Sequence, residues 1–175
     1  MSGTGWSIRR AAPEDAARLA LVGAATFLET FAGVLDGEAI VAHCAREHAA
    51  DRYAAFLADG AQAWLVEAET GGAPIGFALL ARPDLPGQRA GDLELKRIYL
   101  LSRFHGGGAG AALMCAAADE ALDQGAARLL LGVYEHNRRA IAFYRKQGFE
   151  PVARRQFEVG GRPYDDIVLA RVFGK

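Results

Sequence analysis

Glycine and alanine fill six consecutive positions, Gly106 to Ala111, between an apolar segment that ends at Leu100 and an alanine-rich segment with helical spacing. A glycine loop at the start of a helix leaves several backbone N–H groups bare at the positive end of the helix dipole, and such groups bind phosphate. Side chains would block the approach of an anion, so glycine is the residue that this chemistry needs. The sequence therefore predicts a phosphate cradle between a strand and a helix.

Two other interpretations of this loop stay open at the level of the motif. Gly106 to Ala111 also satisfies the loose G-x-G-x-x-A dinucleotide fingerprint, and Glu135 could serve as its ribose-binding acid. That fingerprint belongs to a fold that needs several further parallel strands, whereas only about forty residues follow Glu135, most of them a hairpin. A turn that binds nothing is the third interpretation, although glycines that open a helix cost stability without a reason.

The spacing of apolar residues, and the glycines and prolines between apolar segments, predict the elements that hold this loop. A strand at Leu93–Leu100, a helix at Ala111–Gln124 closed by Gly125, and a nearly all-apolar strand at Arg128–Tyr134 form a strand–helix–strand unit. The other expected elements are strand Ser7–Arg10, a helix from Pro13 to between Thr26 and Phe31, helix Glu38–His48, helix Asp51–Asp59 with Asp51 as N-cap and Gly60 after its end, hairpin Trp64–Glu69 with Ile75–Leu80, helix Asn137–Gln147 stopped by Gly148, and hairpin Phe149–Val159 with Tyr164–Val172. This order predicts a single α/β domain over residues 1–175, with helices flanking a mixed, twisted sheet of about six to seven strands.

Composition excludes several classes of function. Lys and Arg total 20 against 21 for Asp and Glu in 175 residues, so no bulk field draws the chain to nucleic acid or to a membrane surface. The longest apolar run, Ala111 to Ala118, is too short to span a bilayer, and Met1 to Arg10 lacks the apolar stretch of a targeting signal. Cys44 and Cys115 have no paired spacing and lie in alanine-rich helical patterns, which predicts two small buried core residues in a reducing cytoplasm.

Two motifs together resemble the GNAT superfamily of acetyl-CoA-dependent N-acetyltransferases. The run His105-Gly106-Gly107-Gly108-Ala109-Gly110 occupies the family's pyrophosphate loop, Gln/Arg-x-x-Gly-x-Gly/Ala, with His105 in place of the usual first residue and no cation at Gly107. Asn137 to Phe149 matches the second signature, N-x-x-A-x-x-F-Y-x-x-x-G-F, at every fixed position. Loop and signature also follow the family's order and spacing, so the joint match is far more specific than either motif alone.

The resemblance implies acetyl-CoA as co-substrate and a role for each matching residue. Glu94 corresponds to a general base and Tyr144 to the acid that protonates the departing CoA thiolate. The backbone at Ile98 and Leu100 would bind the pantetheine arm, residues 105 to 110 the pyrophosphate, and Asn137 both CoA and the start of its own helix. Glu94 could instead be a surface carboxylate paired with a neighbouring cation, and Tyr144 a plain core aromatic.

Strand periodicity makes a further prediction about the candidate base. With a period of two residues, Glu94, Lys96, Ile98 and Leu100 share one face of their strand, which would aim the carboxylate to the same side as the pantetheine-binding residues. A primary amine has a pKa near about 10.4 and is mostly protonated at neutral pH, so a base must remove a proton before the nitrogen can attack.

The acceptor amine is less well defined by sequence. Residues 25–31 with Tyr53, and the ending at Tyr164–Leu169, resemble the bacterial spermidine/spermine N-acetyltransferase branch, and a polyamine would suit an acidic group of Asp36, Glu38, Asp165 and Asp166. Peptide N-termini, amino acids and other amines fit the same core. The alternative function is a non-catalytic acyl-CoA-binding or regulatory module.

Metal sites and oligomers complete the expectations. The four histidines, His43, His48, His105 and His136, show no ligand spacing typical of a metal site, so we expect none. The open strand edge of the C-terminal hairpin would permit a homodimer.

Overall fold

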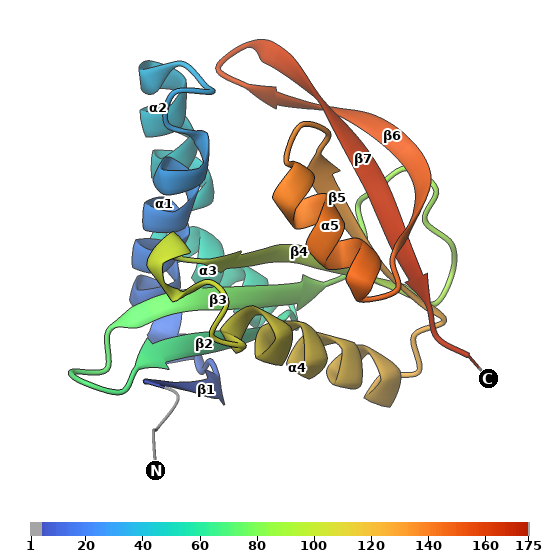
Figure 1. Cartoon of the computed structure of the whole chain (residues 1–175), viewed down its shortest axis with the longest axis horizontal. Helices are drawn as coiled ribbons and strands as arrows, with labels where there is room; N and C mark the ends of the chain where they lie inside the picture. The colour runs from blue at the N-terminus through green and yellow to red at the C-terminus, as the bar shows by residue number, and fades with distance from the viewer. Residues whose placement is uncertain (1–4, 175) are drawn as a thin grey trace.

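A seven-stranded mixed sheet forms the centre of the molecule, with helices on both faces (Figure 1). The structure is a computed structural model that describes residues 5–174; residues 1–4, the start of the segment examined for targeting, and residue 175 lie outside the described residues. One core lies between the sheet and α4, and a second lies between the sheet and the pair α1 and α3. Among the described residues, no helix combines the length and the apolar character needed to cross a membrane.

The elements follow the order expected from the sequence. The strands are β1 (Trp6–Arg10), β2 (Gln62–Ala68), β3 (Pro74–Ala81), β4 (Asp92–Leu100), β5 (Arg128–Tyr134), β6 (Glu150–Val159) and β7 (Arg162–Val172). The helices are α1 (Ala16–Phe31), α2 (Gly37–Glu47), α3 (Ala50–Ala58), α4 (Ala109–Asp123) and α5 (Arg138–Lys146), with single turns of 3-10 helix at Pro13–Asp15 and Ser102–Phe104.

Three local predictions were wrong. Ala49, not Asp51, is the N-cap of α3, so Asp51 lies in the first turn, where its charge still suits the helix dipole. Helix α4 begins at Ala109, two residues early, because Gly108 takes a left-handed conformation and serves as its N-cap. Cys115 is exposed and Cys44 half-buried, since the buried stripe of α4 passes through Met114, Ala117, Ala118 and Ala121 and misses Cys115.

Strand pairing opens a gap in the middle of the sheet. The strand order is β1-β2-β3-β4-β5-β7-β6, and only β4 and β5 are parallel. Their ladder has three residue pairs, from Asp92 with Arg128 to Glu94 with Leu130, after which the strands diverge. Strand β5 pairs with β7, antiparallel, along its whole length from Arg128 to Tyr134, and after Leu130 this is its only pairing in the described sheet. One short parallel pair is incompatible with the dinucleotide fold, which needs several parallel strands.

A β-bulge in β4 overturns the predicted face of Glu94. Leu79 of β3 pairs with Arg97, but Leu80 pairs with Leu95, so Lys96 is an extra residue. A bulge shifts the alternation of side chains by one position. Glu94 therefore shares a face with Arg97 rather than with Ile98 and Leu100, which pack against the core under α4.

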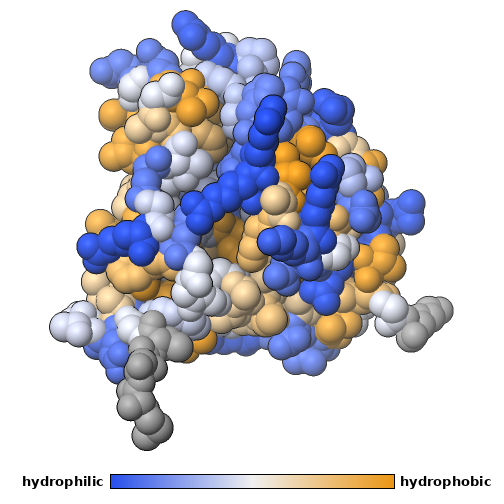
Figure 2. Space-filling view, viewed as in Figure 1, coloured by the Kyte–Doolittle hydropathy of each residue, from blue (hydrophilic) through white to orange (hydrophobic). Residues whose placement is uncertain are grey.

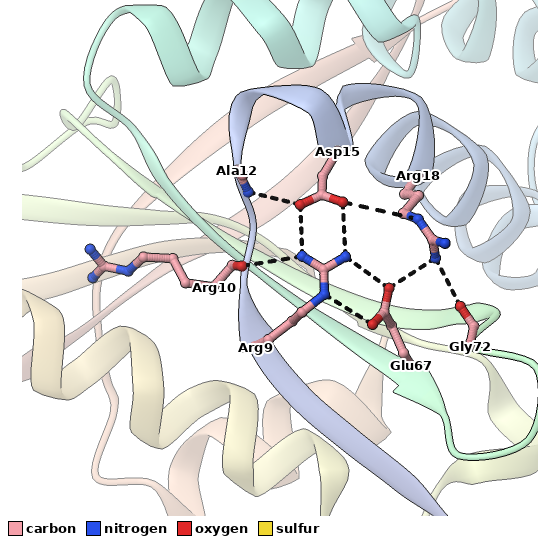
Figure 3. Close-up of polar contacts among 7 residues, drawn as sticks. All are labelled: Arg9, Arg10, Ala12, Asp15, Arg18, Glu67 and Gly72. Carbon is pink, nitrogen blue, oxygen red and sulfur yellow. Dashed lines mark hydrogen bonds and ion pairs between the residues drawn. The ribbon is translucent and has the colours of Figure 1, made fainter.

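An ion-pair network ties the first strand to its neighbours (Figure 3). Arg9 of β1 makes bidentate contacts with Asp15, at 2.7 and 2.8 Å, and with Glu67 of β2, at 3.0 and 2.9 Å. Arg18 of α1 also donates to Glu67, and the N–H of Ala12 donates to Asp15. The hydrogen bonds from Arg9 lower the pKa of Asp15 to about 2, although its burial opposes this shift. The network therefore fixes the entrance of α1 against the sheet edge.

Candidate active site

The start of α4 has the geometry expected of an anion cradle. Gly106 and Gly108 both have positive φ angles, 84° and 85°, which an L side chain rarely adopts. The first helical hydrogen bond is donated by the N–H of Ala112 to the carbonyl of Gly108, at 3.0 Å, so the N–H groups of residues 109–111 precede the helical ladder. Apart from its two chain neighbours, no residue has an atom within 4 Å of the position that a Cβ would take on Gly106, so the loop is open at that point.

Two side chains hold the loop in place. The indole Nε1–H of Trp6, near the start of the sequence, donates to the carbonyl of Gly107 at 3.1 Å. The Nε2 atom of His105 lies 2.7 Å from the carbonyl oxygen of Leu100, and it donates there because a carbonyl only accepts. Two predicted coenzyme-binding residues, His105 and Leu100, therefore meet each other. The ring of His105 fastens the loop to the end of β4.

One cavity of about 820 Å³ connects this loop with the gap between β4 and β5. It is lined by most of the residues that sequence motifs selected: Glu94, Ile98, Leu100, His105, Gly106, Gly108, Gly110, Asn137 and Tyr144. Gly107 and Ala109 do not line it; Ala109 is fully buried under the helix. Figure 2 shows the hollow between the side formed by α1 and α2 and the side formed by α5 and the C-terminal hairpin, with hydrophobic residues visible inside and hydrophilic residues at the rim.

A buried ion pair closes the narrow end of the gap. Arg128 at the start of β5 contacts Asp92 at the start of β4 through Nε to Oδ1 at 3.1 Å and Nη2 to Oδ2 at 2.6 Å. The same guanidinium donates to the carbonyl of Gly87 at 2.9 Å, and the N–H of Arg89 donates to Asp92 at 2.6 Å. These bonds satisfy both buried charges and tie the two strands together where they begin to diverge.

Helix α5 carries Tyr144 into the cavity. The side chain of Asn137 accepts a hydrogen bond from the N–H of Ala140 at 3.1 Å, which confirms its predicted role as N-cap. Tyr144 packs between Phe143 and Phe149 and is 8% exposed. Burial raises the pKa of Tyr144 above its ordinary value of 10.0, so the hydroxyl is protonated at neutral pH and can donate a proton.

Glu94 is buried, 5% exposed, and is one of the residues that line the cavity. Its Oε2 atom accepts the N–H of Asp84 at 2.7 Å and lies 2.9 Å from Nζ of Lys96. The ion pair with Lys96 is the structural role that sequence analysis left open. Both donors meet the same oxygen, and a carboxylate has capacity at Oε1 for a further donor such as an ammonium or a water.

Sequence analysis named Asp166 for its charge but missed the buried ion pair that it forms with Arg155 in the cavity. Asp166 of β7 is 6% exposed, and its Oδ2 lies 3.1 Å from Arg155 of β6. Burial raises the pKa of Asp166, although Arg155 opposes the shift. Gly132 of β5 makes room for this pair, because a Cβ there would lie 2.8 Å from Nη2 of Arg155. Of the acidic group proposed for a polyamine, only Asp166 lines the cavity, and Asp36 is the N-cap of α2.

Comparisons with known proteins agree with this geometry. The profile of the family described as Acetyltransferase (GNAT) family matches residues 26–149. An uncharacterized N-acetyltransferase of Mycobacterium tuberculosis is 37% identical over 157 residues, which cover 90% of this chain and 97% of the relative.

Solved structures share the whole fold. The PaiA N-acetyltransferase of Thermoplasma acidophilum, in complex with coenzyme A, superposes with a TM-score of 0.77 at 21% identity, covering 99% of this chain and 100% of the other. A GCN5-related N-acetyltransferase of Rhodopseudomonas palustris gives 0.74 at 22% identity, covering 99% of each chain. Together with the match of the family profile over most of the sequence, the loop and the cavity lead to one conclusion: this chain belongs to the GNAT family of acetyltransferases.

Proposed function

We propose that this chain, as one domain over residues 1–175, transfers the acetyl group of acetyl-CoA to a primary amine of a small molecule or a peptide. The observation that carries the proposal is a single cavity that joins the open amide cradle at residues 106–111 to a buried carboxylate, Glu94, and a protonated hydroxyl, Tyr144. Both the family and the relatives named N-acetyltransferase support the same reaction.

Coenzyme binding would use mainly backbone groups. The pyrophosphate fits the N–H groups of Gly110 and Ala111 at the start of α4, where the helix dipole favours negative charge. The pantetheine arm fits the free edge of β4 beside Ile98 and Leu100, beyond the last residue pair with β5. Glycine at position 107 supplies no cation, so we expect the affinity for CoA to depend on the loop conformation more than on side-chain charge.

The reaction would proceed by direct attack within a ternary complex. The acceptor arrives as an ammonium and loses a proton to Glu94, directly or through one water. The amine nitrogen then forms a bond to the thioester carbon, and a backbone N–H of β4 holds the developing oxyanion. The nitrogen releases its second proton to water as the intermediate collapses to the amide and the C–S bond breaks. Tyr144 donates its proton to the departing thiolate. The bulge at Lys96 suits this division, because it separates the face of Glu94 from the face of Ile98.

A panel of amines tests this function directly. Thiol release from acetyl-CoA is followed with polyamines, amino acids, peptides, arylalkylamines and aminoglycosides, and CoA affinity is measured separately by calorimetry. Turnover of at least one amine class, with CoA binding and without NADH binding, supports the transferase. CoA binding without turnover of any amine would instead favour the non-catalytic acyl-CoA-binding module.

Two further expectations belong to the proposal. Strand β6 lies at one edge of the sheet, so its backbone can pair with a second copy, and light scattering would detect a homodimer. Both cysteines are free, in line with a cytoplasmic location.

A further inference from the structure

Six of the aromatic rings that line the cavity form one group of neighbours, and they come from five elements. We call them the aromatic collar: Phe27 and Phe31 of α1, His43 of α2, Tyr134 of β5, Phe157 of β6 and Tyr164 of β7. None of them belongs to the coenzyme motifs. Phe27 and His43 are buried, whereas the other four rings are half-buried and keep surface that a ligand can contact.

The helical half of the collar is a row of touching rings. Phe27 lies 4.6 Å from Phe31 and 4.3 Å from His43, between ring centroids, and it stacks on His43 at an angle of 19°. Phe31 reaches across to Tyr134 at 6.4 Å, and His43 reaches across to Phe157 at 5.8 Å. Both ends of the helical row therefore contact the sheet.

The rings on the sheet connect the two ends of the helical row. Tyr134 lies edge-on to Tyr164 at 6.1 Å, and Tyr164 is directly opposite Phe157 in the ladder of β6 and β7. Residues directly opposite each other in an antiparallel pair have neighbouring side chains. The six rings thus form a closed series of neighbours around one part of the cavity.

The collar carries no charge of its own at neutral pH. Burial lowers the pKa of His43, so its imidazole is neutral there, and its Nδ1 atom is buried without a hydrogen-bond partner among the described residues. Aromatic faces are electron-rich, so the collar attracts both apolar groups and a single positive charge.

A carboxylate with its own arginine partner lies beside the collar, and further arginines line the cavity nearby. Asp166 is opposite Tyr134 in the ladder of β5 and β7, and its partner Arg155 lies 5.7 Å over the ring of Phe157. Glu47, one of the other carboxylates that line the cavity, is met by three arginines, Arg46, Arg52 and Arg97. One ammonium can be accommodated near Asp166, but these arginines repel a ligand with several positive charges.

We propose that the aromatic collar selects the acceptor, and that the acceptor is an arylalkylamine: a primary amine with a single positive charge, joined by a short alkyl spacer to an aromatic ring. The inference rests on the proposed function, which it narrows to one class of amine. The ring of the acceptor packs against the half-buried faces of Phe31, Phe157 and Tyr164, and the amine extends toward the open part of β4.

Binding measurements test the collar without relying on turnover. Calorimetry on the full chain saturated with CoA compares 2-phenylethylamine with ethylamine, which lacks the ring, and with spermidine, which adds charges. We expect 2-phenylethylamine to bind at least about tenfold more tightly than either of the others, the size of one aromatic contact with a desolvated ring.

Two variants test whether the collar causes the tighter binding of 2-phenylethylamine. Phe157→Leu should weaken 2-phenylethylamine about fivefold to tenfold and leave CoA affinity and the melting temperature unchanged. Phe31→Leu, on the opposite side, provides a second test if the first variant folds poorly. Phe173→Leu is the matched control, because Phe173 is also half-buried beside an arginine but does not line the cavity.

The outcomes separate the two proposals. Equal or tighter binding of spermidine or ethylamine, absence of 2-phenylethylamine binding, or binding insensitive to both collar variants would overturn the collar as an arylalkylamine site. Acetylation of spermidine in that case would leave the transferase intact. Collar-dependent binding of 2-phenylethylamine without thiol release from any amine would support the collar site and refute the transferase.

Discussion

Replacing Tyr144 by phenylalanine removes one hydroxyl from the cavity and leaves the aromatic packing between Phe143 and Phe149 in place. Burial raises the pKa of Tyr144 above 10.0, whereas a free thiol has a pKa near about 8.5. Proton transfer to the thiolate is therefore uphill by more than about 1.5 pKa units, or about 2 kcal/mol. General acid catalysis contributes about 10²-fold to 10⁴-fold, and an acid that works uphill belongs at the lower end. We expect Tyr144→Phe to lower kcat about 100-fold.

The assay follows thiol release at saturating amine, with acetyl-CoA varied. The KM for acetyl-CoA should change by less than about threefold, because the variant leaves the cradle untouched. The wild-type rate should also show no alkaline decline below about pH 10, since a tyrosine with a raised pKa keeps its proton throughout that range.

Tyr99→Phe is the matched control for this prediction. Tyr99 also lines the cavity, its pKa is also raised by burial, and its ring stacks on Phe77, 6.1 Å away. Its hydroxyl has no part in the proposed proton transfers, so Tyr99→Phe should retain nearly full activity. An unchanged kcat in Tyr144→Phe, or a large loss in Tyr99→Phe alone, would refute Tyr144 as the acid.

Three further perturbations follow from other parts of the structure. Gly108→Ala places a side chain at φ 85°, which costs about 1–2 kcal/mol; we expect a melting temperature lower by about 2–8 °C and weaker CoA binding in calorimetry, and unchanged values would contradict the left-handed cap. Arg128→Met leaves Asp92 buried without its partner and should cost about 3–5 kcal/mol in denaturant unfolding, whereas the double variant with Asp92→Leu should recover most of this loss. Burial lowers the pKa of His48 to about 3 from 6.5, so below pH 6.5 the unfolded chain takes up a proton that the folded chain does not. The free energy of unfolding should therefore fall by about 2 kcal/mol between pH 6.5 and 5, with a shallower slope in His48→Gln; an identical slope would show that other groups cause it.

The sequence predicted an element correctly where a residue type has one main structural role. Asn137 caps α5 because its side chain can accept the first free N–H, and Gly148 ends that helix because it adopts φ 85°. Apolar residues from Arg128 to Tyr134 predicted the bounds of β5, since a strand buried on both faces needs no alternation. The coenzyme motifs depend on such local rules, and for this reason their elements were predicted correctly apart from the start of α4.

The acceptor side depended on contacts that no local pattern encodes. Glu94 to Leu100 reads as regular alternation, and the bulge at Lys96 follows from how β4 meets β3. The aromatic collar joins five elements, so neither spacing nor composition indicated it. Asp166 was selected for its charge alone; its burial and its pairing with Arg155 follow from the small residue at Gly132. The fold and the coenzyme loop were therefore predictable, but the acceptor chamber was not.

Because the ladder between β4 and β5 is short, few backbone hydrogen bonds connect the two halves of the sheet. On one side lie β1 to β4, and on the other lie β5 to β7, joined at one end by Asp92 and Arg128. A ligand bound along the rest of the gap would contact both halves of the sheet. Because such a ligand binds only the folded chain, it raises the free energy of unfolding, by about 2.7 kcal/mol when its concentration is 100 times Kd. The coenzyme would thus help to hold together the very protein that consumes its acetyl group.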